Sequence, residues 1–116
     1  MNIRKQRFGT GVVVLDVLED RLDAAVAEDF RSSVLAAIEE GAGKLVINLG
    51  NVAFMDSSGL GALVGCLRHV GAEGSIVLSS VTRPVERVLR LTRINRVFEV
   101  FEDTAAAIQA SAPAHS

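Results

Sequence analysis

The sequence predicts an α/β protein of a single domain, built on a mixed sheet of four to five strands with four to five helices. Short β-branched runs alternate along the chain with stretches of ten or more residues that have helical spacing. The 116 residues are 49% hydrophobic, which is enough for one core, and no linker or repeat divides them. Strands that alternate with helices pair in parallel, so at least part of the sheet is parallel.

The first half of the chain predicts a hairpin, a helix and a central strand. Residues 3–8 can pair with the β-branched run 11–17 across a Gly-Thr-Gly turn. Asp23 is expected to be the N-cap of the first helix, which ends near Gly41. The apolar residues of this helix recur every four positions: Val26, Phe30, Val34 and Ile38. Residues 44–49, an apolar run between glycines, predict the central strand.

The second half of the chain predicts two further pairs of strand and helix and a closing helix. A helix starts at the Asp56-Ser57-Ser58-Gly59 segment and is expected to continue until Gly71. The later elements are a strand over 75–80, a helix with Pro84 in its first turn, a strand over 97–101 and a short helix over 104–110. Residues 111–116 are expected to be a flexible tail, so the domain is predicted to span residues 1–110.

Composition narrows the class of protein. A net charge of -2 favours neither polyanion binding nor attachment to an anionic membrane surface. Cys66 is the only cysteine, which rules out an intrachain disulfide or a cysteine-based metal cluster. The longest apolar stretch, residues 57–67, is about half of the roughly 20 residues that a membrane-spanning helix needs. The start of the chain has no signal-peptide pattern, so the protein is expected to be cytoplasmic. It is also expected to carry no cofactor or metal.

The sequence offers no catalytic base for an enzymatic mechanism. Ser57 could be a nucleophile, but His69 lies roughly 18 Å further along the same predicted helix and His115 is in the tail. The segment also lacks the glycine that precedes the catalytic serine of a hydrolase. It lacks the lysine of a nucleotide-binding loop as well, so a phosphate-binding loop for nucleotides is a weak alternative. The chain is therefore expected not to be an enzyme.

Two charged segments bear on partners. Arg83, Arg87 and Arg90 share one face of the third predicted helix, and no aromatic residues are interleaved with them. A solvated helix face is therefore expected there rather than a nucleic-acid patch. The alternative is that these arginines form a second contact surface. The segment around Asp23 is acidic, with Asp16, Glu19, Asp20, Asp23, Glu28 and Asp29. A partner is expected to offer a complementary basic patch.

The Asp56-Ser57-Ser58-Gly59 segment is the candidate site. It lies where a strand meets the start of a helix, and the free N–H groups of a helix start attract anions. A phosphoryl group on a serine there would be tolerated by the fold and would act on whatever partner covers the surface. The competing interpretation is simple capping, since Ser, Asp and Gly are common at helix starts.

The stretch Val52–Gly65, read as VAFMDSSGLGALVG, resembles the signature of the STAS domain, and in particular of the bacterial anti-sigma factor antagonists. Arg21-Leu22-Asp23 resembles the acidic turn of that family, and the order of elements agrees through Ile108. Two positions depart from the family pattern, because Asp20 and Arg93 stand where the family often has glycine. A single STAS-like domain is therefore the predicted fold.

The resemblance implies a phosphorylation switch. It implies that Ser57 is the phosphoacceptor, with Ser58 as second choice, and that the unphosphorylated protein binds an anti-sigma factor that is also an ATP-dependent serine kinase. That binding would release a sigma factor, and a PP2C-like, metal-dependent phosphatase would reset the switch. The partner-binding residues are expected to be Asp23, Asp56, Ser57, Ser58, Gly59 and Leu60. The alternative function is a STAS scaffold subunit of a transporter-associated or stress-signalling complex, without a phospho-switch.

Overall fold

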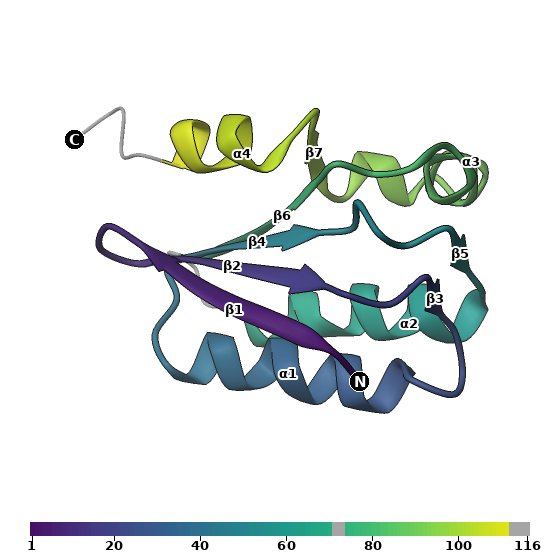
Figure 1. Ribbon diagram of the computed structural model, residues 1–116, viewed down its shortest axis with the longest axis horizontal. Coiled ribbons are helices and arrows are strands. Elements are labelled where there is room, and N and C mark those ends of the chain that lie inside the picture. The colour runs from purple at the N-terminus through teal and green to yellow at the C-terminus, as the bar shows by residue number, and fades with distance from the viewer. Residues whose placement is uncertain (71–73, 112–116) are drawn as a thin grey trace.

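The computed structural model describes residues 1–70 and 74–111, which contain two sheets and the helices around them (Figure 1). The larger sheet has five strands in the order β1-β2-β4-β6-β7. Their bounds are β1 Ile3–Phe8, β2 Val12–Val17, β4 Lys44–Asn48, β6 Ser75–Ser79 and β7 Glu99–Phe101. β1 is antiparallel to β2, and the other neighbours are parallel. The predicted mixed sheet and the predicted opening hairpin are confirmed.

Four α-helices and two 3-10 turns surround the sheet. Their bounds are α1 Ala27–Glu39, α2 Ser57–Gly65, η1 Cys66–His69, α3 Arg83–Leu91, η2 Ile94–Arg96 and α4 Thr104–Ser111. In Figure 1, α1 and α2 lie against one face of the large sheet and α4 lies over the other. The fold is therefore a sheet between two helical layers.

Strand β2 shows how the sheet divides the core into two parts. Val13, Leu15 and Val17 point into the larger cluster, which also contains buried residues of α1 and α2. Val14 points the other way and packs with Val46, Val77 and Ala107 in a smaller cluster that includes α4. Because successive side chains of a strand face opposite sides, one β-branched run supplies both cores.

A second sheet consists of two short parallel strands, β3 Arg21–Leu22 and β5 Phe54–Met55. The sequence does not predict this sheet, because a strand of two residues shows no detectable alternation. The backbone of Asp20 adds to the contact, its carbonyl accepting hydrogen bonds from the N–H groups of Ala53 and Phe54 at 2.8 and 3.2 Å. The small sheet lies beyond the ends of β2 and β4, at the right of Figure 1.

Several predicted boundaries are corrected. Asp23 is not the N-cap of the first helix, which begins at Ala27 with Val26 in the cap position. The Asp23 carbonyl instead accepts hydrogen bonds from the N–H groups of Val26 and Ala27, at 3.1 and 2.9 Å, and forms a turn before the helix. The second helix tightens into a 3-10 turn after Gly65.

The last predicted elements are also adjusted. The strand expected over 97–101 starts at Glu99, and α4 extends to Ser111, which had been assigned to the tail. The expected stop at Gly71 and the rest of the expected tail, 112–116, lie outside the described residues. The domain limits 1–110 stay a prediction.

Candidate functional site

The start of α2 is fixed by the carboxylate of Asp56, its N-cap. Oδ1 of Asp56 accepts hydrogen bonds from the N–H groups of Ser58 and Gly59 at 2.9 and 3.0 Å. Oδ2 accepts a third from the N–H of Ala24, at 3.3 Å, and so joins α2 to the turn that precedes α1. One side chain therefore caps a helix and holds two segments together that are 32 residues apart in the sequence.

These contacts favour the charged form of Asp56. The hydrogen bond from Gly59 lowers the pKa of this carboxyl most, and partial desolvation opposes that effect. The hydrogen bonds from Ala24 and Ser58, together with the positive charge of Arg21, lower the pKa further. Asp56 therefore carries a full negative charge at neutral pH, next to Ser57.

Both serines of the site are exposed, at the first two positions of α2. The hydroxyl of Ser57 forms no hydrogen bond with any residue in the described part of the chain. It lies beside helix N–H groups that attract negative charge. The geometry can therefore accept a phosphoryl group without breaking an interaction of the Ser57 side chain.

The next two residues connect the site to the core. Gly59 is buried, and a Cβ atom there would lie 2.1 Å from the carbonyl oxygen of Leu22. Glycine is needed because the first turn of α2 touches the backbone of β3. Leu60 is half-buried and packs against the larger core cluster, while its N–H donates to the carbonyl oxygen of Asp56 at 3.0 Å. Both residues adjoin the exposed serines, and their role in partner binding stays a prediction.

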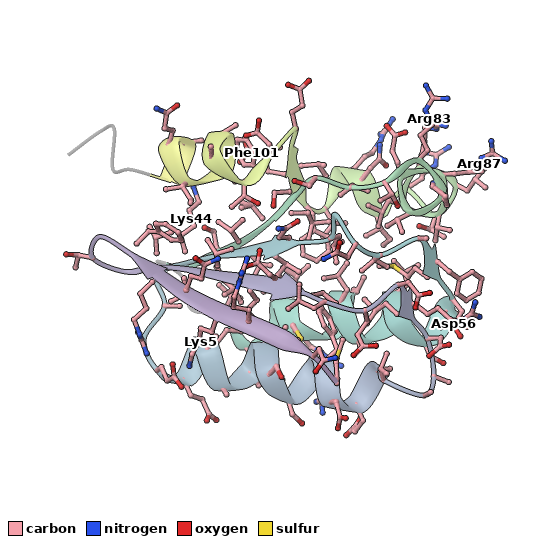
Figure 2. All side chains as sticks on the ribbon, viewed as in Figure 1. Lys5, Lys44, Asp56, Arg83, Arg87 and Phe101 are labelled. Atoms are coloured by element: carbon pink, nitrogen blue, oxygen red, sulfur yellow. The ribbon has the colours of Figure 1, made fainter. Side chains whose placement is uncertain are left out.

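Asp23 lies next to this helix start, as its neighbour Ala24 donates to Asp56. Oδ1 of Asp23 accepts a hydrogen bond from the N–H of Ala25 at 3.1 Å. Oδ2 pairs with Nε of Arg21, also at 3.1 Å. The structure thus brings the two predicted acidic residues to the same end of the molecule, where Figure 2 labels Asp56.

Arg21 and Phe54 extend this surface, and no role for either side chain is predicted from the sequence. The guanidinium carbon of Arg21 lies 4.2 Å from the centroid of the Phe54 ring, and both side chains are exposed. Their contact follows from the register of β3 and β5, which places Arg21 opposite Phe54.

The arginine stripe belongs to α3, which lies next to β5 of the small sheet. Arg83, Arg87 and Arg90 are all exposed on α3, as predicted, and Arg90 pairs with Glu86 at 3.8 Å. Figure 2 shows Arg83 and Arg87 extending away from the body of the protein. The exposure fits a solvated helix face and does not identify a ligand.

Two observations bear on other functions. Within residues 1–70 and 74–111, no group of three or more His, Cys, Asp or Glu side chains is placed to hold a metal ion. In the same residues, the helices are all too short or too polar to cross a membrane.

The fold and the helix start define a member of the STAS domain family. The STAS domain model matches residues 6–107, so the chain belongs to this family. A Thermotoga maritima protein, provisionally named an anti-sigma factor antagonist, is 30% identical over 73 residues, which are 62% of this chain and 65% of that protein. The matched region thus spans just under two thirds of that relative.

Two further proteins support the relationship. The anti-sigma-B factor antagonist of Staphylococcus epidermidis is 27% identical over 84 residues, 72% of this chain and 78% of that protein. The solved structure of an anti-sigma-factor antagonist (STAS) domain protein from Planctomyces limnophilus has a TM-score of 0.82 and 27% identity, and the match covers 93% of this chain and 95% of that chain. The predicted STAS-like fold is confirmed.

Proposed function

We propose that this protein is an anti-sigma factor antagonist controlled by phosphorylation of Ser57. The unphosphorylated form binds an anti-sigma factor that is also a serine kinase, and a sigma factor is released. Phosphorylation of Ser57 by that kinase ends the binding, and a PP2C-like phosphatase restores it. The observation that carries the proposal is the exposed, unbonded hydroxyl of Ser57 at the capped start of α2.

The position of Ser57 supports a switch that acts on the partner. A phosphoryl group at the start of α2 meets the positive end of the helix dipole, and no hydrogen bond of the hydroxyl is lost. On the outer side, the added charge of roughly -1.5 to -2 joins the carboxylates of Asp56 and Asp23. A partner that covers this surface must desolvate the new charge, so the phosphorylated form binds less well.

The test is a binding measurement with the anti-sigma factor that co-purifies from the native host. We expect Ser57→Ala to bind it as the unphosphorylated wild type does and to be refractory to the kinase. Ser57→Asp should bind at least about 100-fold more weakly, which corresponds to about 3 kcal/mol. Isothermal titration calorimetry measures both affinities, and phosphopeptide mapping identifies the modified serine.

The neighbouring serine provides matched controls. Ser58→Ala should still be phosphorylated, and Ser58→Asp should lose less affinity than Ser57→Asp. If the mapping assigns the phosphate to Ser58, the phosphoacceptor is wrong but the switch stands. If protein carrying authentic phosphoserine at position 57 binds the anti-sigma factor as tightly as the unmodified protein, the switch is refuted and constitutive docking as a scaffold subunit is favoured.

A further inference from the structure

We propose that Arg21 is the internal counter-ion of the phosphorylated protein. When Ser57 carries a phosphoryl group, the guanidinium of Arg21 leaves Asp23 and binds the phosphate. This inference rests on the proposed function in one respect, namely that Ser57 is the phosphoacceptor. Arg21 is then a positioning residue, and its movement changes the charges and exposed groups of the docking surface when Ser57 is phosphorylated.

Arg21 lies beside the start of α2, because the first turn of α2 touches the backbone of Leu22, the next residue of β3. Strand β3 pairs with β5, so Arg21 is opposite Phe54, three residues before Ser57. Its charge already acts on the carboxylate of Asp56, which immediately precedes Ser57 and accepts hydrogen bonds from the first turn of α2. Among the four residues of the small sheet, Arg21 is the only charged one.

The present contacts of Arg21 are weak enough to be exchanged. Its side chain is 57% exposed, and it pairs with Asp23 through a single N–H, from Nε, at 3.1 Å. An exposed ion pair of this kind contributes little to stability because water screens it. A phosphate dianion offers three oxygens and about twice the charge, and a guanidinium can bind it with two parallel hydrogen bonds.

The exchange would alter three groups that face a partner. Arg21 is the one cationic partner of Asp23 among the described residues, so Oδ2 of Asp23 would become unpaired while Oδ1 kept its hydrogen bond from Ala25. The Phe54 ring, which is 40% exposed, would lose the guanidinium that lies over it. The phosphate itself would be partly neutralised by Arg21. Phosphorylation of Ser57 would thus leave the Asp23 carboxylate without its ion pair and the Phe54 ring uncovered.

The experiment uses full-length protein with phosphoserine incorporated at position 57 during translation, so neither kinase nor partner is needed. Phosphorus NMR follows the titration of the phosphate in the wild type and in Arg21→Gln. A nearby cation favours the dianion, so we expect the phosphate pKa to be higher in Arg21→Gln by about half a unit. The Nε–H signal of Arg21 should also move on phosphorylation, because the guanidinium leaves the Phe54 ring current.

Two variants serve as controls. Arg83→Gln removes another exposed arginine, on α3, and should leave the phosphate titration unchanged. Arg21→Lys keeps the charge but loses the planar fork, so its titration should lie between those of the wild type and Arg21→Gln. The amide spectrum of each unphosphorylated variant verifies that the fold is intact.

Coincident phosphate titrations of folded wild type and Arg21→Gln would overturn the inference, as would an Arg21 signal that phosphorylation does not move. Neither result depends on a kinase. Failure to find an anti-sigma factor partner would instead count against the proposed function and leave this measurement unaffected.

Discussion

Gly59 determines how closely α2 approaches strand β3. A methyl group there would lie 2.1 Å from the carbonyl oxygen of Leu22 and 2.9 Å from its carbonyl carbon, and backbone atoms cannot rotate away as a side chain can. We predict that Gly59→Ala lowers the free energy of unfolding by about 3 kcal/mol, near the upper end of usual overpacking costs. Chemical denaturation monitored by circular dichroism measures the change.

Gly61 in the same helix is the matched control. Apart from its chain neighbours and the backbone of α2 itself, no described atom lies within 4 Å of the position of a Cβ added there. Gly61→Ala should therefore raise the free energy of unfolding by about 0.5–1 kcal/mol, through the higher helix propensity of alanine. Equal effects of the two substitutions would show that α2 does not rest on the backbone of Leu22.

Asp16 is a buried acid on the face of the sheet that carries α4. Burial alone would raise the pKa of this carboxyl, but hydrogen bonds from Asn48, Gln6 and Arg4 and the charge of Arg4 together outweigh it and lower the pKa. Oδ1 accepts from Asn48 at 2.7 Å, and Oδ2 accepts from Gln6 and Arg4 at 2.7 and 3.0 Å. The charged form of Asp16 is thus the stable one in the folded protein.

A lowered pKa gives a definite pH dependence. The unfolded chain binds a proton at Asp16 more readily than the folded protein does. The stability that the charged Asp16 contributes is therefore fully present well above its ordinary pKa of 3.8, and it is lost as the pH falls through the lower pKa of the folded protein. We predict that Asp16→Asn lowers the free energy of unfolding by about 1 kcal/mol at pH 7. The difference from wild type should shrink below about pH 4. Urea denaturation at both pH values measures it, and a difference independent of pH would contradict the assignment.

At the scale of elements, the connection between α3 and β7 contains a strained residue. Arg93 has φ +65°, in the left-handed region that favours glycine, and it begins the turn η2. This is one of the two positions where the sequence departs from the family pattern. The carbonyl of Arg90 accepts its N–H at 3.1 Å, so the turn keeps its geometry without help from the Arg93 side chain.

We predict that Arg93→Gly raises the free energy of unfolding by up to about 1 kcal/mol. Relief of the left-handed conformation is worth about 1–2 kcal/mol, and the greater freedom of glycine in the unfolded chain offsets part of it. Arg96→Gly is the control, since Arg96 is exposed, lies in the same turn and does not have a positive φ. It should be neutral or destabilising in thermal unfolding. A loss of stability in Arg93→Gly would show that the arginine side chain holds the turn.

The elements that the sequence predicts are those long enough to show a period. Strands β2, β4 and β6 and helices α1 to α3 follow from apolar runs and helical spacing, and β1 follows from the Gly-Thr-Gly turn. Asp56 and Ser57 follow from the chemistry of helix starts. The small sheet could not be predicted, because the pairing of β3 with β5 depends on where the ends of β2 and β4 lie in the folded protein. The contact of Arg21 with Phe54 depends on that pairing. A local capping preference favours Asp23 as the N-cap of α1 and does not reveal that the next residue, Ala24, donates a hydrogen bond to Asp56.

At the scale of the whole molecule, the charges are unevenly arranged. The acidic residues Asp20, Asp23 and Asp56 lie around the candidate site, whereas α3 carries the exposed Arg83, Arg87 and Arg90. Ser57 adds to the acidic side when phosphorylated. Neither serine of the site belongs to the buried clusters. Charge at Ser57 can therefore change association without changing packing.

This separation predicts that Ser57→Asp keeps the stability of the wild type, within about 0.5 kcal/mol, in urea denaturation at neutral pH. The new carboxylate meets the positive end of the α2 dipole, and the repulsion from Asp56 acts through solvent at an exposed position. Leu63→Ala is the control in the same helix, because Leu63 is fully buried and its truncation should cost about 2–5 kcal/mol. If Ser57→Asp lost as much stability as Leu63→Ala, reduced binding by that variant would reflect unfolding, and the phosphate could not act as a purely external signal.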